Sequence, residues 1–124
     1  MNQKELLIQR KKVWRSYHVP GMGNYTTRPV NAIFLSPKNT WEHEMWKAKV
    51  CHEILKKGMK FVTEAVCNKT GDRADIVVLD TGDRIEVETT KRRAKRFESK
   101  ESPFPITVIA TWAIPDPEKW ELII

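Results

Sequence analysis

One segment near the middle of the chain limits the possible folds more than any other feature. Residues 74–79 read ADIVVL and are almost all apolar, which is typical of a strand covered on both faces. The sequence DTGD at 80–83 is typical of a tight hairpin turn, and residues 84–90 then form a second strand with an alternating pattern. A strand covered on both faces needs layers above and below it, so we expect an α/β or α+β fold.

The rest of the chain supplies elements that could cover this hairpin. The clearest helix is predicted at 41–57 and ends before Gly58. Asn39 and Glu42 resemble a capping box, with Asn39 as the N-cap. The other expected elements are helices at 3–17 and 91–100, strands at 32–35, 60–66 and 106–113, and a short tail at 115–124, with at most one helical turn. This order predicts a mixed central sheet flanked by helices.

Length and composition fit one small domain. The chain has 124 residues, of which 40% are hydrophobic and 31% are charged. This is enough for a modest core and too apolar for a disordered tail. We expect a single domain over 1–124, with its core at about 41–113, a basic N-terminal extension at 1–40 and a C-terminal tail at 114–124.

Charge favours a polyanionic partner. Lys and Arg number 22 against 16 Asp and Glu, a formal net charge of +6, and nucleic acid is the commonest partner of such small basic domains. No apolar run approaches the roughly 20 residues that span a bilayer, and the N-terminus lacks the apolar segment of a signal peptide. Cys51 and Cys67 form no CxxC pair and are expected to be free thiols of a cytoplasmic protein.

Three carboxylates are expected to converge at one edge of the sheet. Glu86 and Glu88 are two residues apart in a strand and therefore share a face. Asp75 begins the preceding strand, which places it near Glu88 in an antiparallel pair. Carboxylates brought together repel one another; a hard cation such as Mg²⁺ relieves the repulsion and can activate water against a phosphodiester. The alternative is that Glu86 and Glu88 lie on a solvated strand face and Asp75 is a residue at a turn edge.

The helix at 41–57 contributes a further acidic residue. At about 100° per residue, Glu44 falls on the core-facing side of the first turns, and Lys47 and His43 share that half of the helix. A buried glutamate needs a partner or a cation. Either Glu44 belongs to a metal site, or it forms a buried ion pair with Lys47 at i, i+3. A lone histidine such as His43 is more commonly a packing or capping residue than a ligand.

Four short motifs follow one another in order: HEMWK at 43–47, FVTE at 61–64, RADIVV at 73–78 and IEVET at 85–89. Together they resemble the core of the PD-(D/E)xK nuclease superfamily, which includes many restriction endonucleases and archaeal Holliday-junction resolvases. The resemblance covers about residues 41–113 and implies a restriction-endonuclease-like αβββαβ core.

The resemblance also implies roles for single residues. Asp75, preceded by alanine where the family has proline, and Glu86 would be metal ligands. Glu44 would be the acidic residue of the first helix that often helps to bind the metal. Glu88 stands where the family usually has lysine, so either Glu88 acts as a base or ligand, or a lysine comes from elsewhere. The implied catalytic set is Glu44, Lys47, Asp75, Glu86, Glu88 and Lys91, with Asp75, Glu86 and Glu44 binding Mg²⁺, for which Mn²⁺ is expected to substitute.

A strongly basic segment follows the acidic strand. Residues 91–100 hold six Lys or Arg and one Glu. As a helix, this segment would present a basic surface beside the acidic site and suit contacts with phosphates. The residues expected to bind nucleic acid are Lys91, Arg92, Arg93, Lys95 and Arg96. The alternative is a solvated, charged helix.

Five tryptophans are many for this length. We expect Trp46 and Trp112 in the core. Trp14, Trp41 and Trp120 are expected to pack in the core or an interface, with stacking on bases as the alternative. The apolar tail at 120–124 is a candidate contact of a homodimer, which the resemblance implies because one small nuclease core covers little DNA.

The leading hypothesis is a metal-dependent endonuclease that hydrolyses DNA phosphodiester bonds, although the sequence does not distinguish DNA from RNA. The main alternative is a protein of the same fold that has lost catalysis and binds nucleic acid or a protein partner. The missing lysine at position 88 favours that alternative. A third hypothesis is a basic accessory protein of unrelated α+β fold, in which the acidic residues are solvated and hold no metal.

Overall fold

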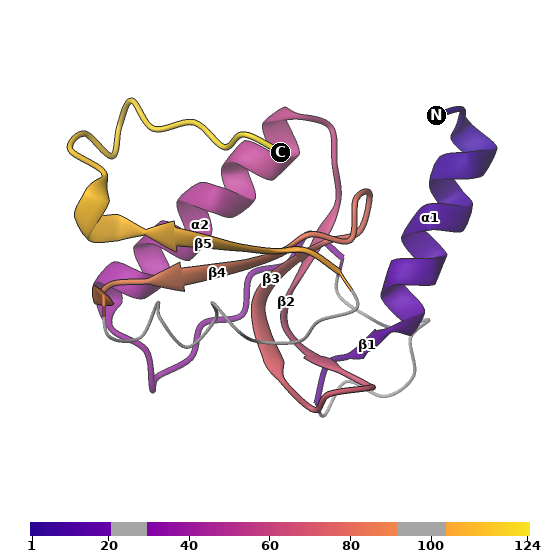
Figure 1. The fold of residues 1–124 in the computed structure, drawn as a ribbon, viewed down its shortest axis with the longest axis horizontal. Coiled ribbons are helices and arrows are strands. Elements are labelled where there is room, and N and C mark those ends of the chain that lie inside the picture. Colours follow the sequence, from indigo (N-terminus) through magenta and orange to yellow (C-terminus); the bar gives the residue numbers. More distant parts are fainter. Residues whose placement is uncertain (21–29, 92–103) are drawn as a thin grey trace.

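The computed structural model describes residues 1–20, 30–91 and 104–124 and has an α+β fold with one mixed sheet (Figure 1). Its elements are α1 (Gln3–Arg15), β1 (Tyr17–His18), α2 (Trp41–Lys56), β2 (Phe61–Cys67), β3 (Arg73–Val78), β4 (Arg84–Glu88), β5 (Ile106–Ala110) and a 3₁₀ turn, η3 (Thr111–Ala113). The predicted α+β class with a mixed sheet flanked by helices is confirmed, and the restriction-endonuclease-like core stays a prediction. The predicted helix at 91–100 lies outside the described residues from position 92 onward.

The five strands lie in the order in which they occur along the chain. β1, β2, β3 and β4 pair in antiparallel fashion, and β5 then pairs with β4 in parallel. β3 is central, as its apolar sequence predicts, and Ala74, Ile76, Val77 and Val78 are fully buried. The short strand β1 was not predicted. It follows directly on α1, whose C-cap is Ser16, so the first helix is shorter than the predicted 3–17.

Apolar clusters lie on both faces of the sheet. The first apolar cluster joins α2 to the sheet through Val50, Ile54, Phe61 and Ile85. The second cluster joins Val13 and the segment after α1 to the opposite side chains of β2 and β3. Each buried Val or Ile contributes roughly 1.5–3 kcal/mol relative to an exposed one. These two clusters therefore fix α2 against β2–β4 and α1 against the outer part of the same sheet (Figure 1).

The turn between β3 and β4 is the hairpin turn that the sequence predicts. The N–H of Gly82 donates to the carbonyl of Val78 at 2.8 Å. Gly82 has a φ of +83°, and a Cβ atom there would lie 2.6 Å from the ring of Phe104. The turn therefore needs glycine both for its backbone conformation and for the close approach of that ring.

The beginning of α2 differs from the prediction by one residue. Thr40, not Asn39, is the N-cap, because its hydroxyl oxygen accepts the N–H of His43 at 3.1 Å. Asn39 instead donates its side-chain amide to Glu44 at 2.9 Å. The predicted capping box was wrong, since the candidate cap side chain is bound to a carboxylate further along the helix.

The predicted strand at 32–35 is also wrong. This segment is irregular. It lies near β2 through side-chain hydrogen bonds and single backbone contacts, and it forms no regular strand pairing. The N–H of Phe34 donates to the hydroxyl of Thr63 at 2.9 Å, and that hydroxyl donates to the carbonyl of Ala32 at 3.2 Å. Asn31, at a φ of +62°, turns the chain just before the segment, and its N–H donates to the carbonyl of Phe61.

The C-terminal part contains two more differences. The strand predicted at 106–113 ends at Ala110, and the 3₁₀ turn that follows leaves Trp112 40% exposed, so its predicted place in the core was wrong. Trp46 is buried as predicted, and the Trp120 ring packs against its edge. Within the described tail at 114–124 there is no helix.

The tail returns alongside α2 (Figure 1). Leu122 is buried in the α2 cluster, whereas Ile123 is 92% exposed. Part of the segment expected to form a dimer contact thus belongs to the protein's own core, and the homodimer stays a prediction. Cys51 and Cys67 are buried free thiols, as expected. No helix among the described residues is long and apolar enough to cross a membrane.

Candidate functional site

The site begins with an interruption of β2. Glu64 has a φ of +52°, which is uncommon for a residue other than glycine. Before it, Phe61 and Val62 alternate between the two apolar clusters, but Ala65 then lies in the same cluster as Val62 although it is an odd number of positions, three, further along the strand. The alternation is therefore reset at Glu64, whose carboxylate reaches Lys47 of α2 at 2.9 Å.

Asp75 lies opposite this interruption. Thr63 pairs with Ile76 and Ala65 with Ala74, so the register puts Asp75 across from Glu64. The regular pairing of β3 with β4 ends at Ile76, and beyond it Oδ2 of Asp75 accepts the backbone N–H of Val87 at 2.8 Å. The Asp75 carboxylate thus takes the place of a strand carbonyl between β3 and β4.

His43 connects α2 to Asp75. Its Nδ1 lies 2.8 Å from Oε1 of Glu44, and its Nε2 lies 3.1 Å from Oδ2 of Asp75. Burial alone would lower the pKa of His43, but its contacts with Asp75 and Glu44 raise that pKa to about 9. Burial would also raise the pKa of Asp75, but the His43 hydrogen bond and charge hold it below its usual value. His43 is therefore a protonated bridge between two ionised carboxylates at neutral pH.

Glu44 is held by four donors. Oε1 contacts Asn39 and His43, and Oε2 accepts the N–H of Ser36 at 3.0 Å and contacts Lys47 at 2.8 Å. Burial would raise the pKa of Glu44, but the hydrogen bonds from Lys47 and the other donors lower it to about 2. The predicted position on the core-facing side is confirmed, and in this arrangement both carboxylate oxygens are already engaged.

Lys47 is completely buried. Its ammonium contacts Glu44 at 2.8 Å, Glu64 at 2.9 Å and the carbonyl of Phe34 at 2.7 Å. These three partners match the three N–H donors of the group. Burial would lower the pKa of Lys47, but the two carboxylates raise it above its usual value. The ion pair with Glu44 that the sequence left open is confirmed, and Glu64 is its second partner.

Glu86 is the second carboxylate at Asp75. The pairing of Ile76 with Ile85 places Glu86 opposite Asp75, and Glu86 is 2% exposed. Burial raises its pKa to about 8, the charge of Asp75 adds to the shift, and the Arg84 guanidinium opposes it. The two carboxyl groups contact each other through a hydrogen bond. Asp75 and Glu86 are thus a coupled pair in which Glu86 retains a proton at neutral pH.

Arg84 supports Glu86 from the same strand. Its Nε donates to Oε1 of Glu86, and its Nη2 donates to the carbonyl of Arg73 at 3.0 Å. Sequence reasoning missed three features: the role of Arg84, the bridge formed by His43, and the contact between Glu64 and Lys47. The available signal for Arg84 was its two-residue spacing from Glu86, because alternate residues of a strand share a face.

Glu88 and Lys91 lie further from the pair. Glu88 is buried and pairs in register with Ala110 of β5. It shares a face with Glu86 as predicted, because Ile85 and Val87 lie in the α2 cluster on the other face. However, the register puts Asp75 opposite Glu86 and not Glu88. Lys91 is exposed at the end of a described segment. The other residues expected to bind nucleic acid, Arg92, Arg93, Lys95 and Arg96, lie outside the described residues.

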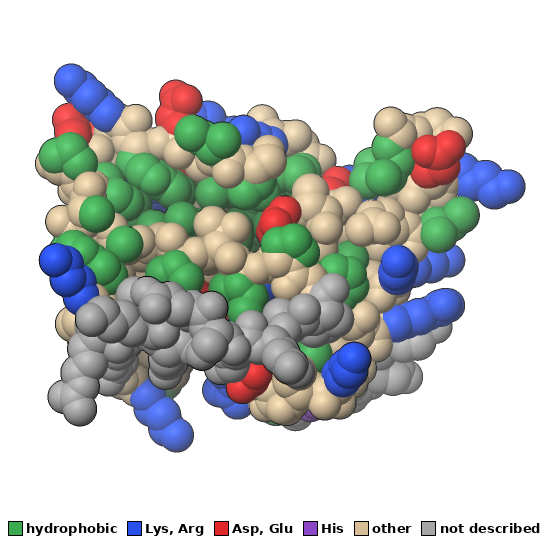
Figure 2. Space-filling view, viewed as in Figure 1, with side chains coloured by type: hydrophobic (Ala, Val, Ile, Leu, Met, Phe, Trp, Pro, Cys, Tyr) green, Lys and Arg blue, Asp and Glu red, His purple; other side chains and the backbone are tan. Residues whose placement is uncertain are grey.

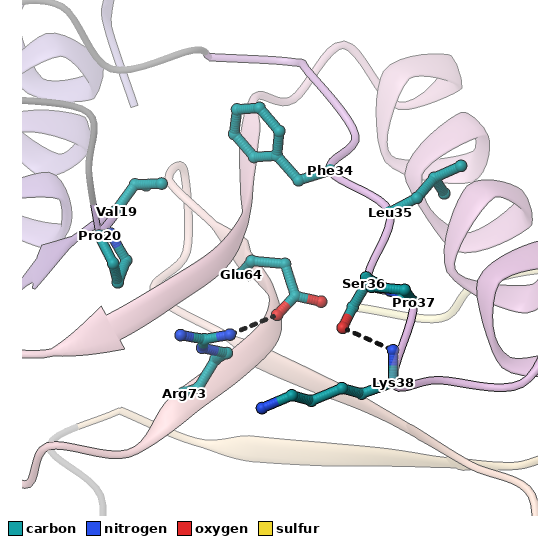
Figure 3. A pocket seen from close by; sticks show the side chains of 9 residues that line it. All are labelled: Val19, Pro20, Phe34, Leu35, Ser36, Pro37, Lys38, Glu64 and Arg73. Carbon is teal, nitrogen blue, oxygen red and sulfur yellow. Dashed lines mark hydrogen bonds and ion pairs between the residues drawn. The ribbon is translucent and has the colours of Figure 1, made fainter.

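A pocket of about 350 Å³ opens beside this network (Figure 3). Glu64 joins the two, because one of its oxygens contacts Lys47 and the other lies 3.8 Å from the guanidinium of Arg73. The described residues that line the pocket are Val19, Pro20, Phe34, Leu35, Ser36, Pro37, Lys38, Glu64 and Arg73. Its walls are mostly apolar, and two cationic side chains stand on one side.

In residues 1–20, 30–91 and 104–124, no group of three or more His, Cys, Asp or Glu side chains is arranged to hold a metal ion. Comparisons with protein-family models, with curated proteins and with solved structures found no match.

Proposed function

We propose that the protein is a metal-dependent endonuclease that hydrolyses DNA phosphodiester bonds. The contact between the carboxyl groups of Asp75 and Glu86 carries this proposal. Two buried carboxyl groups in contact need a proton or a cation between them, because their charges repel strongly where water is scarce. Here the proton resides on Glu86, whose pKa is about 8.

The donor set of this pair fits Mg²⁺. The ion prefers carboxylate oxygens and commonly keeps several waters beside one or two protein carboxylates. When bound, Mg²⁺ would polarise a phosphodiester oxygen and lower the pKa of a bound water. Glu44 would join the pair as a ligand only by releasing a present partner, because both its oxygens are engaged.

The other buried residues would position the pair. His43 holds Asp75 from the helix side, and the N–H of Val87 holds the same oxygen from the sheet. Lys47 has its three donors in use, so it would orient Glu44 and Glu64 and not a water molecule. Glu88, on the face of Glu86, keeps its proposed role as a base or further ligand, and Lys91 remains the candidate source of a free ammonium.

Fold and charge support a nucleic-acid substrate. The described elements α2, β2, β3, β4 and β5 follow the order of the restriction-endonuclease-like core that the motifs resemble. The formal net charge is +6, and Lys and Arg side chains project along the outer side of α1 (Figure 2). Such a surface suits phosphate contacts that do not depend on base sequence. The basic segment from Lys91 to Arg96 is proposed to add to it.

The direct test is cleavage of labelled linear, supercoiled and branched DNA with Mg²⁺ or Mn²⁺, with EDTA as the metal-free control. We expect cutting that needs the metal and that disappears in Asp75→Asn, which keeps a side-chain oxygen for the N–H of Val87. Asp116→Asn, on the exposed tail, is the matched control and should cut normally. Absence of cutting on every substrate, or cutting that persists in Asp75→Asn, would contradict the proposal.

One observation favours a second candidate, a protein of this fold that binds nucleic acid or a partner without catalysis. The polar and charged groups of the site already have protein partners: Arg84 binds the carboxyl group of Glu86, His43 binds Asp75, and Lys47 lies between Glu44 and Glu64. Such a site is stable without a metal. This candidate predicts DNA binding that EDTA and Asp75→Asn leave unchanged, together with no cutting.

A further inference from the structure

The pocket beside Glu64 has a mixed chemistry that the proposed hydrolysis does not use. Its apolar lining includes the side chains of Phe34, Pro20 and Pro37, and the two prolines lie on opposite sides of the pocket in Figure 3. Lys38 and Arg73 also line the pocket: in Figure 3 the Lys38 side chain extends toward Arg73, whose guanidinium lies beside Glu64. Apolar walls with a few placed polar groups are typical of small-molecule sites, and about 350 Å³ lies at the lower end of their size range.

The charge of this pocket favours an anion. Among the lining residues that the structure describes, Glu64 is the only acidic one, and Lys47, which is completely buried, already neutralises that carboxylate at 2.9 Å. Arg73 lies 3.8 Å from Glu64, beyond a good hydrogen bond, and its side chain is 56% exposed. Lys38 is exposed, and its ammonium has no ion pair with a residue in the described part of the chain. Two cations therefore remain to bind a phosphate.

The pocket also adjoins the proposed metal site. Arg73 precedes Asp75 by two residues in β3, and the N–H of Ser36 on the pocket wall donates to Glu44. A ligand in the pocket would thus lie against the same network that positions Asp75. A polynucleotide cut at the Asp75–Glu86 pair would bring a neighbouring nucleotide to this place.

We propose that this pocket binds a single unpaired nucleotide of the substrate, with the base against Phe34 and the prolines and the phosphate on Lys38 and Arg73. This inference rests on the proposed nuclease function and deepens it by naming the substrate form. A base stacked within a duplex must leave the stack to enter a walled pocket, and this is easiest for a base that is already unpaired. Aromatic and apolar walls accept any base by its face, so the preference is for strand form and not for sequence. The substrate class is single-stranded or locally unpaired DNA.

The first test is binding in EDTA, where no cutting occurs. Fluorescence anisotropy would compare a labelled single-stranded 12-mer with a blunt duplex of the same sequence. We expect the wild-type chain to bind the single strand about tenfold more tightly, and the double variant Lys38→Gln/Arg73→Gln to lose this preference. The matched double variant Lys57→Gln/Lys60→Gln removes two exposed charges elsewhere and should keep the preference.

A second measurement identifies the ligand. Amide chemical shifts would be followed by NMR during titration with deoxyadenosine monophosphate, deoxyadenosine or inorganic phosphate. We expect the amides of Phe34, Lys38 and Arg73 to shift with the nucleotide at concentrations at least about tenfold below those needed for either fragment. Equal response to phosphate alone would overturn the nucleotide assignment, as would equal binding of duplex and single strand.

Failure of this inference and failure of the proposed function give different results. Metal-dependent cutting without any strand preference, or with a preference that Lys38→Gln/Arg73→Gln retains, would overturn the pocket assignment and leave the nuclease intact. Nucleotide binding that needs Lys38 and Arg73, in a chain that cuts no DNA with any metal, would overturn hydrolysis and support the pocket as a nucleotide site.

Discussion

The two halves of α2 pack against the same sheet with opposite chemistry. The C-terminal half buries Val50, Cys51 and Ile54 in an apolar cluster. The N-terminal half places His43 beside the strands and buries Glu44 and Lys47 against them. Both halves bury a carboxylate, but the cationic partner of Glu53 in the C-terminal half, Lys56, is 55% exposed, whereas Lys47, the partner of Glu44 in the N-terminal half, is completely buried.

The apolar contacts of the C-terminal half are needed for stability, whereas the buried charges of the N-terminal half are not. Apolar side chains at the buried positions of the N-terminal half would hold the helix as well, because buried ion pairs are often no more stabilising than apolar residues of similar volume. We infer that the charged half is kept for the geometry that it gives Asp75, whereas the apolar half holds the helix on the sheet. The following predictions test this division.

The largest effect is expected on catalysis. Asp75→Asn should reduce metal-dependent DNA cleavage by about 10,000-fold, equivalent to roughly 5 kcal/mol in the barrier, while the melting temperature changes little. Ile54→Val, in the apolar half, should do the reverse: its unfolding free energy falls by about 1 kcal/mol and its cleavage rate is retained. Equal loss of cleavage in the two variants would contradict the proposal that the two halves of α2 have different roles.

The next effect is on stability. Lys47→Met should lower the unfolding free energy by about 3–5 kcal/mol, because it leaves Glu44 and Glu64 buried without their cation. Urea denaturation measures this directly. In the triple variant Lys47→Met/Glu44→Gln/Glu64→Gln the uncompensated charges are absent, and we expect much of the loss to be recovered. A single variant as stable as wild type would mean that the network does not hold the helix.

The sequence predicts well whatever depends on neighbouring residues. The helix at 41–57, the hairpin at 80–83 and the shared face of Glu86 and Glu88 follow from periodicity and turn chemistry, and the structure confirms them. The i, i+3 spacing likewise predicts the pair of Glu44 and Lys47. The tight turn also predicts that Asp75 lies beside the acidic strand, although the register places it opposite Glu86 and not near Glu88 as predicted.

What the sequence does not predict depends on contacts between distant segments. Glu64 resets the alternation of β2 through a positive φ that glutamate rarely adopts, so no local pattern indicates it. His43 bridges to Asp75 only because the first turn of α2 lies above that point of the sheet. The segment at 32–35 has the composition of a strand, but β2 offers it side-chain contacts instead of a free ladder.

The pH dependence of stability should distinguish the two halves further. His43 has a pKa of about 9 when folded and 6.5 as its usual value, so its contribution is fully present below pH 6.5 and is lost as the pH rises through 9. The pKa of Glu86 is raised from 4.5 to about 8, so its contribution to stability is likewise lost as the pH rises between those values. The pKa of Glu44 is lowered to about 2, so Glu44 affects stability only at acid pH. Its contribution is present above pH 4.5 and is lost as the pH falls toward 2.

Melting temperature measured from pH 5 to 9.5 tests this expectation. Stability should already decline from about pH 5 because of Glu86, and should decline further above about pH 6.5 because of His43, whose part is on the order of 2 kcal/mol. His43→Gln should remove only this second part of the decline. Ile54→Val should lower the whole curve without changing its shape. A His43→Gln curve parallel to that of wild type would show that the bridge is not protonated.

The smallest effect is expected at the start of the charged half. Thr40→Ala removes the hydroxyl that caps the N–H of His43 and should lower the unfolding free energy by about 1 kcal/mol. Asn39→Ala should leave the cap intact but free one oxygen of Glu44, so its effect should appear as a raised pKa of Glu44 in NMR titration. A larger loss of stability in Asn39→Ala than in Thr40→Ala would restore Asn39 as the effective cap.

The parallel pairing of β5 with β4 also has a consequence for the folding pathway. Strands β2, β3 and β4 are joined by short turns, whereas β5 reaches its partner only after 17 intervening residues, from 89 to 105. Closing a long loop has a larger entropic penalty than closing a short one. We expect the transition state for folding to contain the hairpins that carry Glu64, Asp75 and Glu86, with β5 docking afterwards. Stopped-flow refolding would then give higher φ-values for Val77→Ala in β3 than for Ile109→Val in β5, and the reverse order would show that the long-range closure comes first.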